Sequence, residues 1–164
     1  MSENEKVSVL GAGVIGASWA SLFLASGRSV AVYDPAPNAE AFVRSYVTTA
    51  WPVLQELGLV KVPEVPPLTF HASPAEAVRG AVFVQESVPE KIELKHALYR
   101  DIEDALSPDA VVSSSASGLT MTEMQGGWKN PARFVLGHPF NPPHLVPLVE
   151  VMGNDRTAPG VVER

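Results

Sequence analysis

The feature that most constrains this chain is a glycine-rich turn near its start. Residues 7–10 form a short run with two β-branched valines, and the next six residues read Gly-x-Gly-x-x-Gly. Gly11 permits a tight turn from strand to helix, Gly13 lets the backbone approach a pyrophosphate, and Gly16 lets the helix pack closely against the strand. The first free N–H groups of the helix then point at the phosphates. The spacing predicts a dinucleotide site made by the residues of this turn: Gly11, Gly13, Val14, Ile15 and Gly16.

The residues that follow place this turn in the context that such a site requires. Residues 17–26 are predicted to form a helix, and a second strand over residues 29–33 ends in Asp34. Asp34 lies about twenty residues beyond the glycines, where a carboxylate can bind both ribose hydroxyls of an adenosine. It would also repel the 2′-phosphate of NADP, and Arg28 lies at the opposite end of the predicted strand. We therefore predict NAD as the cofactor. The alternative is a glycine turn that merely connects two strands.

Strands and helices alternate along the rest of the chain. Further strands are predicted over residues 68–70, 81–85, 110–112, 133–137 and 148–151, and further helices over 38–57, 74–79, 90–106 and 120–125. Pro52 is predicted to kink or split its helix, and helical spacing in 90–106 predicts that Leu94 and Leu98 are buried. This alternation predicts a Rossmann-type α/β fold, with a doubly wound, mostly parallel sheet and helices on both faces. We find no internal repeat or linker, so residues 1–164 form one domain.

Composition restricts the partners of this domain. The 164 residues carry a formal net charge of −6 and no basic run, which argues against a nucleic-acid surface. The chain has no cysteine, which excludes a disulfide scaffold, a thiolate metal site and a cysteine nucleophile. Its N-terminus is acidic and polar, unlike a targeting peptide, and no apolar run approaches the length of a membrane span. We expect a soluble, cytoplasmic protein that acts on a small molecule.

Candidate reactive residues come from the second half of the chain. Ligands of open α/β sheets bind beyond the carboxyl ends of the strands, and polar residues follow three predicted strands at 85–90, 113–118 and 137–144. Among them, His138 is the natural general base, because imidazole can take a hydroxyl proton near neutral pH as hydride leaves the same carbon. Glu150, a polar residue within an apolar strand, is the candidate carboxylate that holds the other ring nitrogen.

Each of these interpretations has a simpler alternative. His138 could be a histidine hydrogen-bonded at a strand end, and Glu150 could be a solvent-facing residue of an edge strand. His71 and His96 read as surface residues. His144 is closer to the predicted site, but it lies among prolines, and we rank it below His138.

The stretch from Gly137 to Pro142, continuing through 147–151, resembles the signature of the L-3-hydroxyacyl-CoA dehydrogenase family. The resemblance covers nearly the whole chain, including the glycine turn, Asp34 and residues 85–95 and 113–119. Residues 85–95 and 138–143 are most similar to one branch of this family. That branch holds the L-carnitine dehydrogenases and the L-gulonate dehydrogenase/λ-crystallin proteins.

The resemblance implies NAD-dependent oxidation of a 3-hydroxyl, in a 3-hydroxyacyl-CoA or a free 3-hydroxy acid, to a 3-keto product. His138 is then the catalytic base and Glu150 its orienting carboxylate. Ser117 and Asn141 hydrogen-bond the reacting oxygen, although serine and asparagine also cap helices and turns.

The resemblance also implies contacts with the cofactor. Glu90 and Lys95 are expected beside the nicotinamide ribose, and Ser117 is expected at the cofactor as well. Lys95 could equally be a solvated lysine of the predicted helix.

Two departures from the family pattern bear on the substrate and on assembly. CoA-binding members carry a lysine-rich helical hairpin after the second strand, whereas residues 38–67 hold only Arg44 and Lys61 as basic residues. L-Carnitine or L-gulonate is therefore the alternative substrate. The family's helical C-terminal domain, which closes the substrate cleft and forms the homodimer, is absent from these 164 residues, so we expect the cofactor domain of a longer, homodimeric enzyme.

Two other functions compete with this hypothesis. A non-catalytic, crystallin-like NAD-binding protein would have no need of the four residues His138, Glu150, Ser117 and Asn141. A β-hydroxyacid dehydrogenase that uses a catalytic lysine would leave His138 unexplained.

Overall fold

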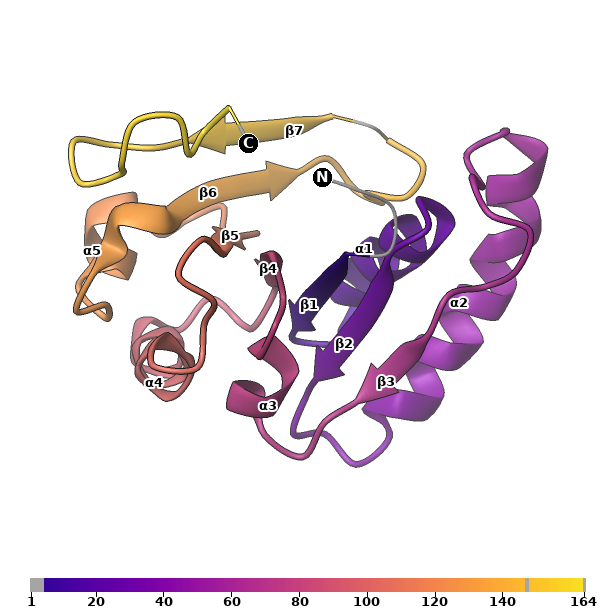
Figure 1. Cartoon of the computed structure of the whole chain (residues 1–164), viewed down its shortest axis with the longest axis horizontal. Coiled ribbons are helices and arrows are strands. Elements are labelled where there is room, and N and C mark those ends of the chain that lie inside the picture. The colour runs from indigo at the N-terminus through magenta and orange to yellow at the C-terminus, as the bar shows by residue number, and fades with distance from the viewer. Residues whose placement is uncertain (1–4, 147, 164) are drawn as a thin grey trace.

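The computed structural model describes residues 5–146 and 148–163. Its centre is a seven-stranded sheet (Figure 1). The strand order is β3-β2-β1-β4-β5-β6-β7. The described strands pair in parallel, except that β7 runs antiparallel to β6. Residues 1–4 of the polar N-terminus and Pro147 of the family signature lie outside the described residues. The Rossmann-type fold expected from the sequence is confirmed.

The elements follow one another in the alternation that the sequence predicts. The strands are β1 (Lys6–Leu10), β2 (Ser29–Tyr33), β3 (Leu68–Phe70), β4 (Phe83–Glu86), β5 (Val111–Ser114), β6 (Phe134–Pro139) and β7 (Val149–Met152). The helices are α1 (Val14–Ala25), α2 (Ala39–Glu56), α3 (Pro74–Val78), α4 (Ile92–Glu103) and α5 (Met121–Gln125), with a 3-10 turn at Pro131–Arg133. Of the helices described, none combines the length and the apolar character needed to cross a membrane.

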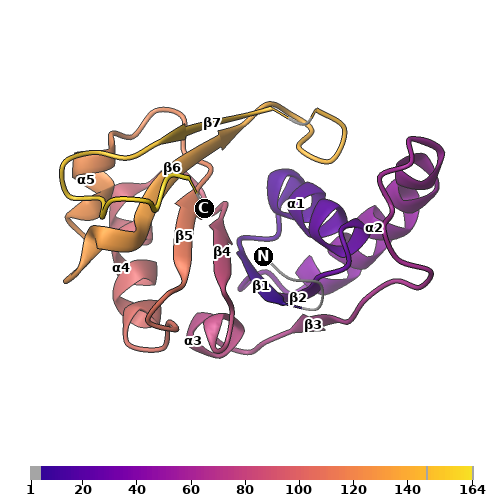
Figure 2. The ribbon, with the colours of Figure 1, turned by 45° about the horizontal axis from the view of Figure 1, so that its top comes forward.

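Helices cover both faces of the sheet, as Figure 2 shows, with α1 and α2 on one side and α3, α4 and α5 on the other. The side chains of β1 alternate between the two resulting cores. Val7 and Val9 pack in the core under α1 and α2, whereas Leu10 packs in the core that includes Tyr99 of α4. Burial on both faces explains why these strands read as nearly continuous apolar runs.

The helices depart from their predicted bounds by at most three residues. The helix α1 begins at Val14, directly after the glycine turn, and so starts earlier than residue 17. The helix α2 is continuous through Pro52, so the predicted split is wrong. Pro52 is exposed, while Val47, Ala50 and Leu54 keep the helical spacing of the buried face on either side of it. The apolar packing therefore holds the helix together despite the missing N–H donor.

Candidate functional site

The carboxyl ends of the parallel strands meet along one edge of the sheet. Leu10, at the end of β1, pairs with Tyr33 of β2 and with Glu86 of β4. Glu86 pairs in turn with Ser114 of β5, which pairs with Leu136 of β6. The strand order reverses at β1 and β4, where open α/β sheets bind their ligands. The loops after these strands therefore form one continuous rim.

The glycine turn contains two glycines that the fold requires and one that it does not. Gly11 has a φ of +90°, and a Cβ there would lie 2.7 Å from the backbone of Ser87. A Cβ on Gly16 would lie 1.9 Å from the carbonyl oxygen of Gly11. Gly13 has an ordinary φ of −68°, and a Cβ there would meet nothing within 4 Å. Gly13 thus leaves open a space that a side chain would fill, as a pyrophosphate cradle requires.

The start of α1 adjoins this open space. No side chain of the described residues caps this helix at Gly13, whose carbonyl accepts the first helical hydrogen bond from Ala17 (2.8 Å). The preceding N–H groups therefore remain available as donors, and the helix dipole places partial positive charge there. Val14, in this first turn, is 61% exposed. The arrangement suits an anionic phosphate.

Asp34 lies beside the turn, at the end of β2. Its Oδ2 accepts a hydrogen bond from the backbone of Ala12 (2.7 Å), and its Oδ1 accepts one from the backbone of Ala36 (2.8 Å). Asp34 lines a cavity of about 480 Å³, whose opposite wall includes Leu94 and Ala97 of α4. A cavity of this size can hold a nucleoside. The held carboxylate keeps free lone pairs for ribose hydroxyls.

His138 and Glu150 face each other across the β6–β7 pair. They are directly opposite partners in the antiparallel register, so their side chains lie on the same face of the sheet. His138 Nδ1 lies 3.4 Å from the carbonyl oxygen of Ser115, to which only a protonated Nδ1 can donate. In the neutral ring this leaves the lone pair on Nε2, as a general base needs. Within the described residues, Glu150 is exposed and forms no hydrogen bond with the ring.

Glu90 joins the loop before α4 to the loop after β5. Its Oε1 accepts hydrogen bonds from the backbone and hydroxyl of Ser117 and from the backbone of Gly118, the last at 3.1 Å. The backbone N–H of Ser117, more than any other group, lowers the pKa of Glu90 below its usual value. The structure thus brings together two residues expected at the cofactor, with Glu90 ionised.

Comparison with known proteins places this geometry in a family. Residues 6–164 match the sequence model described as "3-hydroxyacyl-CoA dehydrogenase, NAD binding domain". The chain belongs to this family. It is an NAD-binding domain, and the open space at Gly13, the uncapped start of α1 and Asp34 fit that cofactor.

Similar proteins include L-carnitine dehydrogenases. The chain is 48% identical to that of Streptomyces coelicolor over 157 residues, which are 96% of this chain and 49% of the relative. It is 44% identical to that of Pseudomonas putida over 163 residues, which are 99% of this chain and 51% of the relative. The chain thus spans about half the length of the curated relatives it matches.

Solved structures share the same fold. A crystal structure of 5-formyl-3-hydroxy-2-methylpyridine 4-carboxylic acid 5-dehydrogenase superposes with a TM-score of 0.88 at 34% identity, covering 98% of this chain and 52% of that one. The Escherichia coli 3-hydroxybutyryl-CoA dehydrogenase gives a TM-score of 0.84 at 25% identity, covering 99% of this chain and 35% of that one.

Lys95 is buried in an ion pair at the end of β4. Its side chain is 1% exposed, and its Nζ lies 2.6 Å and 2.8 Å from the two carboxylate oxygens of Glu86. It is therefore not a solvated lysine, and its contact with the nicotinamide ribose stays a prediction. Glu86, which the sequence analysis did not single out, also accepts hydrogen bonds from Tyr99 and Ser114. The only signal for this pair was a carboxylate at the end of an otherwise apolar strand.

The remaining predicted residues differ in their surroundings. Asn141 is exposed in the loop between β6 and β7, near His138 in sequence, and no hydrogen bond in the described part of the chain joins it to Ser117. His71 is partly exposed, and His96 is half-buried with its Nε2 2.7 Å from the carbonyl oxygen of Glu123. His144, which the sequence analysis ranks below His138, is buried.

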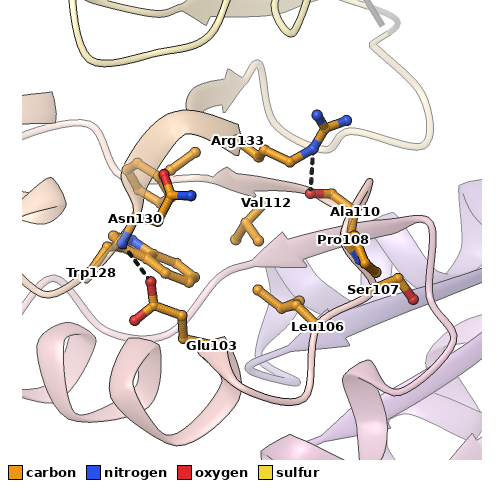
Figure 3. A pocket seen from close by; sticks show the side chains of 10 residues that line it. Glu103, Leu106, Ser107, Pro108, Ala110, Val112, Trp128, Asn130 and Arg133 are labelled. Atoms are coloured by element: carbon orange, nitrogen blue, oxygen red, sulfur yellow. Dashed lines mark hydrogen bonds between the residues drawn. The ribbon is translucent and has the colours of Figure 1, made fainter.

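A second hollow lies at the opposite edge of the sheet in this NAD-binding domain (Figure 3). It has a volume of about 190 Å³ and lies beside Trp128, near the amino ends of β5 and β6. Two of its polar side chains have partners: Arg133 donates to the carbonyl of Ala110 (3.3 Å), and Glu103 accepts from the backbone of Asn130 (2.7 Å). The buried Nε1 of Trp128 has no hydrogen-bond partner among the described residues.

Proposed function

We propose that this domain is part of a dehydrogenase that oxidises the 3-hydroxyl of a 3-hydroxy acid to a ketone with NAD. The observation that carries the proposal is the position of His138, opposite Glu150 on the rim that also holds the glycine turn. A histidine with an available Nε2 beside a carboxylate is the arrangement that proton abstraction from a hydroxyl needs.

In the proposed reaction, Nε2 of His138 takes the hydroxyl proton as the C3–H bond breaks and the C=O bond forms. Bound NAD supplies the acceptor for the hydride that leaves C3. Glu150 stabilises the imidazolium that forms, because it lies on the same face of the β6–β7 pair. Ser117 and Asn141 donate hydrogen bonds to the reacting oxygen and hold it near His138.

The surface of α2 favours a free hydroxy acid over its CoA ester. Arg44, one of two basic residues in the stretch 38–67, is paired with Glu40 at 2.7 Å. Its guanidinium also lies 6.0 Å from the ring centroid of Phe70. This arginine is therefore already engaged, and little positive charge remains for the phosphates of CoA. Relatives that are L-carnitine dehydrogenases support carnitine as the candidate substrate.

NADH formation by the natural full-length protein tests the proposal. L-Carnitine, L-gulonate and 3-hydroxybutyryl-CoA are each supplied with NAD, and the initial rates are compared. We expect the highest kcat/KM with carnitine. Preference for the CoA ester would retain the oxidation but overturn the substrate class. NAD binding without NADH formation from any of the three would overturn the oxidation itself and favour a non-catalytic NAD-binding protein.

The cytoplasmic location and the homodimer stay predictions. Cell fractionation and light scattering of the natural protein test them. A membrane-bound or strictly monomeric protein would contradict them.

A further inference from the structure

His144 is held by a reciprocal pair of hydrogen bonds to Ser18 of α1. The backbone N–H of His144 donates to Ser18 Oγ at 3.0 Å, and Ser18 Oγ lies 2.7 Å from His144 Nδ1. This contact fits the neutral tautomer that carries its proton on Nε2, in which Nδ1 accepts the hydroxyl proton of Ser18. Both residues are buried, with His144 8% exposed and Ser18 0% exposed.

This contact joins two parts of the rim that are far apart in the sequence. Ser18 lies in α1, just after the glycine turn, whereas His144 lies in the loop between β6 and β7. That loop carries Asn141 and connects His138 on β6 to Glu150 on β7. The ring of His144 also packs edge-on against Tyr46 of α2, with centroids 5.6 Å apart.

The loop has few other attachments. The backbone–backbone hydrogen bonds of its described residues stay within the loop, from Phe140 to Leu148 (3.1 Å) and from Leu145 and Val146 to Pro142 (2.9 Å and 3.0 Å). Phe140, Leu145 and Leu148 are 44%, 39% and 54% exposed. Among the hydrogen bonds of the described loop residues, those to Ser18 are the ones that reach α1. The pair therefore fixes where the loop lies.

We propose that His144 is a positioning residue, whose hydrogen bond with Ser18 holds the Asn141 loop at a fixed place relative to the cofactor helix. The consequence for catalysis rests on the proposed function, in which Asn141 bonds the reacting oxygen. Small displacements of such a group reduce the rate by up to about 100-fold, because the reacting atoms lose their alignment. Burial lowers the pKa of His144, which favours the neutral ring at neutral pH.

Three variants of His144 separate this role from simple packing. His144→Asn places an amide oxygen near the position of Nδ1, so it can accept the hydroxyl proton of Ser18. His144→Gln places its amide farther out, near the position of Nε2, and His144→Leu has no acceptor. In the natural full-length protein, we expect Gln and Leu to lower kcat/KM for the hydroxy acid by about 10- to 100-fold. The Kd for NAD stays within about twofold, and Asn restores most of the activity.

A double-mutant cycle gives the second test. Ser18→Ala removes the hydroxyl from the other side and should lower kcat/KM as His144→Leu does, with no further loss in the double variant. Thermal unfolding of each variant checks that the fold is kept. If His144→Leu does not fold, Ser18→Ala alone tests the loss of the hydrogen bond. Full activity in both single variants, or equal losses in the Asn and Leu variants, would overturn the proposal.

An activity-independent measurement separates this inference from the proposed function. Nitrogen-15 NMR of the imidazole should show His144 with an unprotonated Nδ1 and the proton on Nε2. Ser18→Ala should change the Nδ1 resonance and speed amide exchange in the loop. A protonated Nδ1 at neutral pH would contradict the hydrogen bond from Ser18 to Nδ1. Amide exchange in the loop that is unchanged by Ser18→Ala would contradict its role in holding the loop. Absence of any dehydrogenase activity would instead overturn the proposed function. The NMR and exchange results would then still test the hydrogen bond between Ser18 and His144.

Discussion

Two pairs of ionisable residues at the carboxyl ends of the strands differ in almost every respect. Glu86 and Lys95 are 0% and 1% exposed and bonded at 2.6 Å, whereas Glu150 is exposed beside the half-buried His138. The carboxylate of Glu86 is surrounded by further donors, including Tyr99 at 2.8 Å. Burial, and then the charge of Glu86, raise the pKa of Tyr99. Every partner of this buried pair is fixed.

The contrast shows what each pair can do. A buried ion pair with a full set of hydrogen bonds cannot exchange protons or partners without a large loss of stability. His138 and Glu150 share a face of the sheet but keep free nitrogen and oxygen atoms. Such a pair can bind a hydroxyl and change its protonation state during a reaction. Glu86 and Lys95 therefore hold β4 and α4 together, and in the proposed function the proton transfer takes place at His138.

The largest effect on folding should come from breaking the buried pair. Lys95→Met leaves the carboxylate of Glu86 buried without its cation, and we expect a loss of about 3–5 kcal/mol in the free energy of unfolding. Urea denaturation of the chain measures this loss. Glu93→Gln, on the exposed surface of the same helix, is the matched control and should change stability by less than about 0.5 kcal/mol. A loss of under about 1 kcal/mol for Lys95→Met would show that the pair does not stabilise the fold.

A smaller, binding-specific effect should come from the open glycine of the turn. Gly13→Ala has room for its methyl group in the free protein, so we expect an unchanged Tm. The methyl group would occupy the space meant for the pyrophosphate, so the Kd for NAD should rise at least about tenfold, or about 1.4 kcal/mol. Calorimetric titration with NAD measures the change. Gly16→Ala is the contrasting variant, because its methyl group clashes with Gly11 and should destabilise the fold. Unchanged NAD affinity in Gly13→Ala would remove Gly13 from the binding site.

The smallest effect concerns the rim carboxylate of Glu90. Its pKa lies below the usual 4.5 in the folded chain, because the backbone of Ser117 donates to the ionised form. A lowered carboxyl pKa stabilises the fold above pH 4.5, and this contribution is lost as the pH falls through the folded value. Carbon-13 NMR titration of the Glu90 carboxyl should therefore give a midpoint below 4.5. A midpoint at or above that value would mean that Glu90 does not hold the Ser117 loop.

The sequence was sufficient for the fold. Glycine spacing predicts the turn at Gly11, and the alternation of strands and helices predicts the sheet. Helical spacing failed at α4, where it predicts that Leu94 is buried. Leu94 is 44% exposed and lines the cavity beside Asp34, whereas Lys95 is buried. A buried lysine is stabilised by a partner on another element, which no local pattern can reveal.

Dependence on distant partners also explains why the sequence indicated the position of His138 but not the burial of His144. His138 lies near the end of β6 within a recognisable motif, and its position opposite Glu150 follows from the register of β6 and β7. The burial of His144 depends on Ser18, which lies at the other end of the chain. A contact between segments this far apart depends on the arrangement of the whole sheet, so no local sequence pattern indicates it.

We propose that the glycine turn and Asp34 bind NAD, and that His138 performs the proton transfer. The most direct test measures turnover and NAD affinity together in His138→Ala of the natural full-length protein, with carnitine as substrate. We predict that kcat falls by about 10²- to 10⁴-fold, while the Kd for NAD and the Tm stay unchanged. Turnover close to that of the natural protein would contradict the assignment of His138.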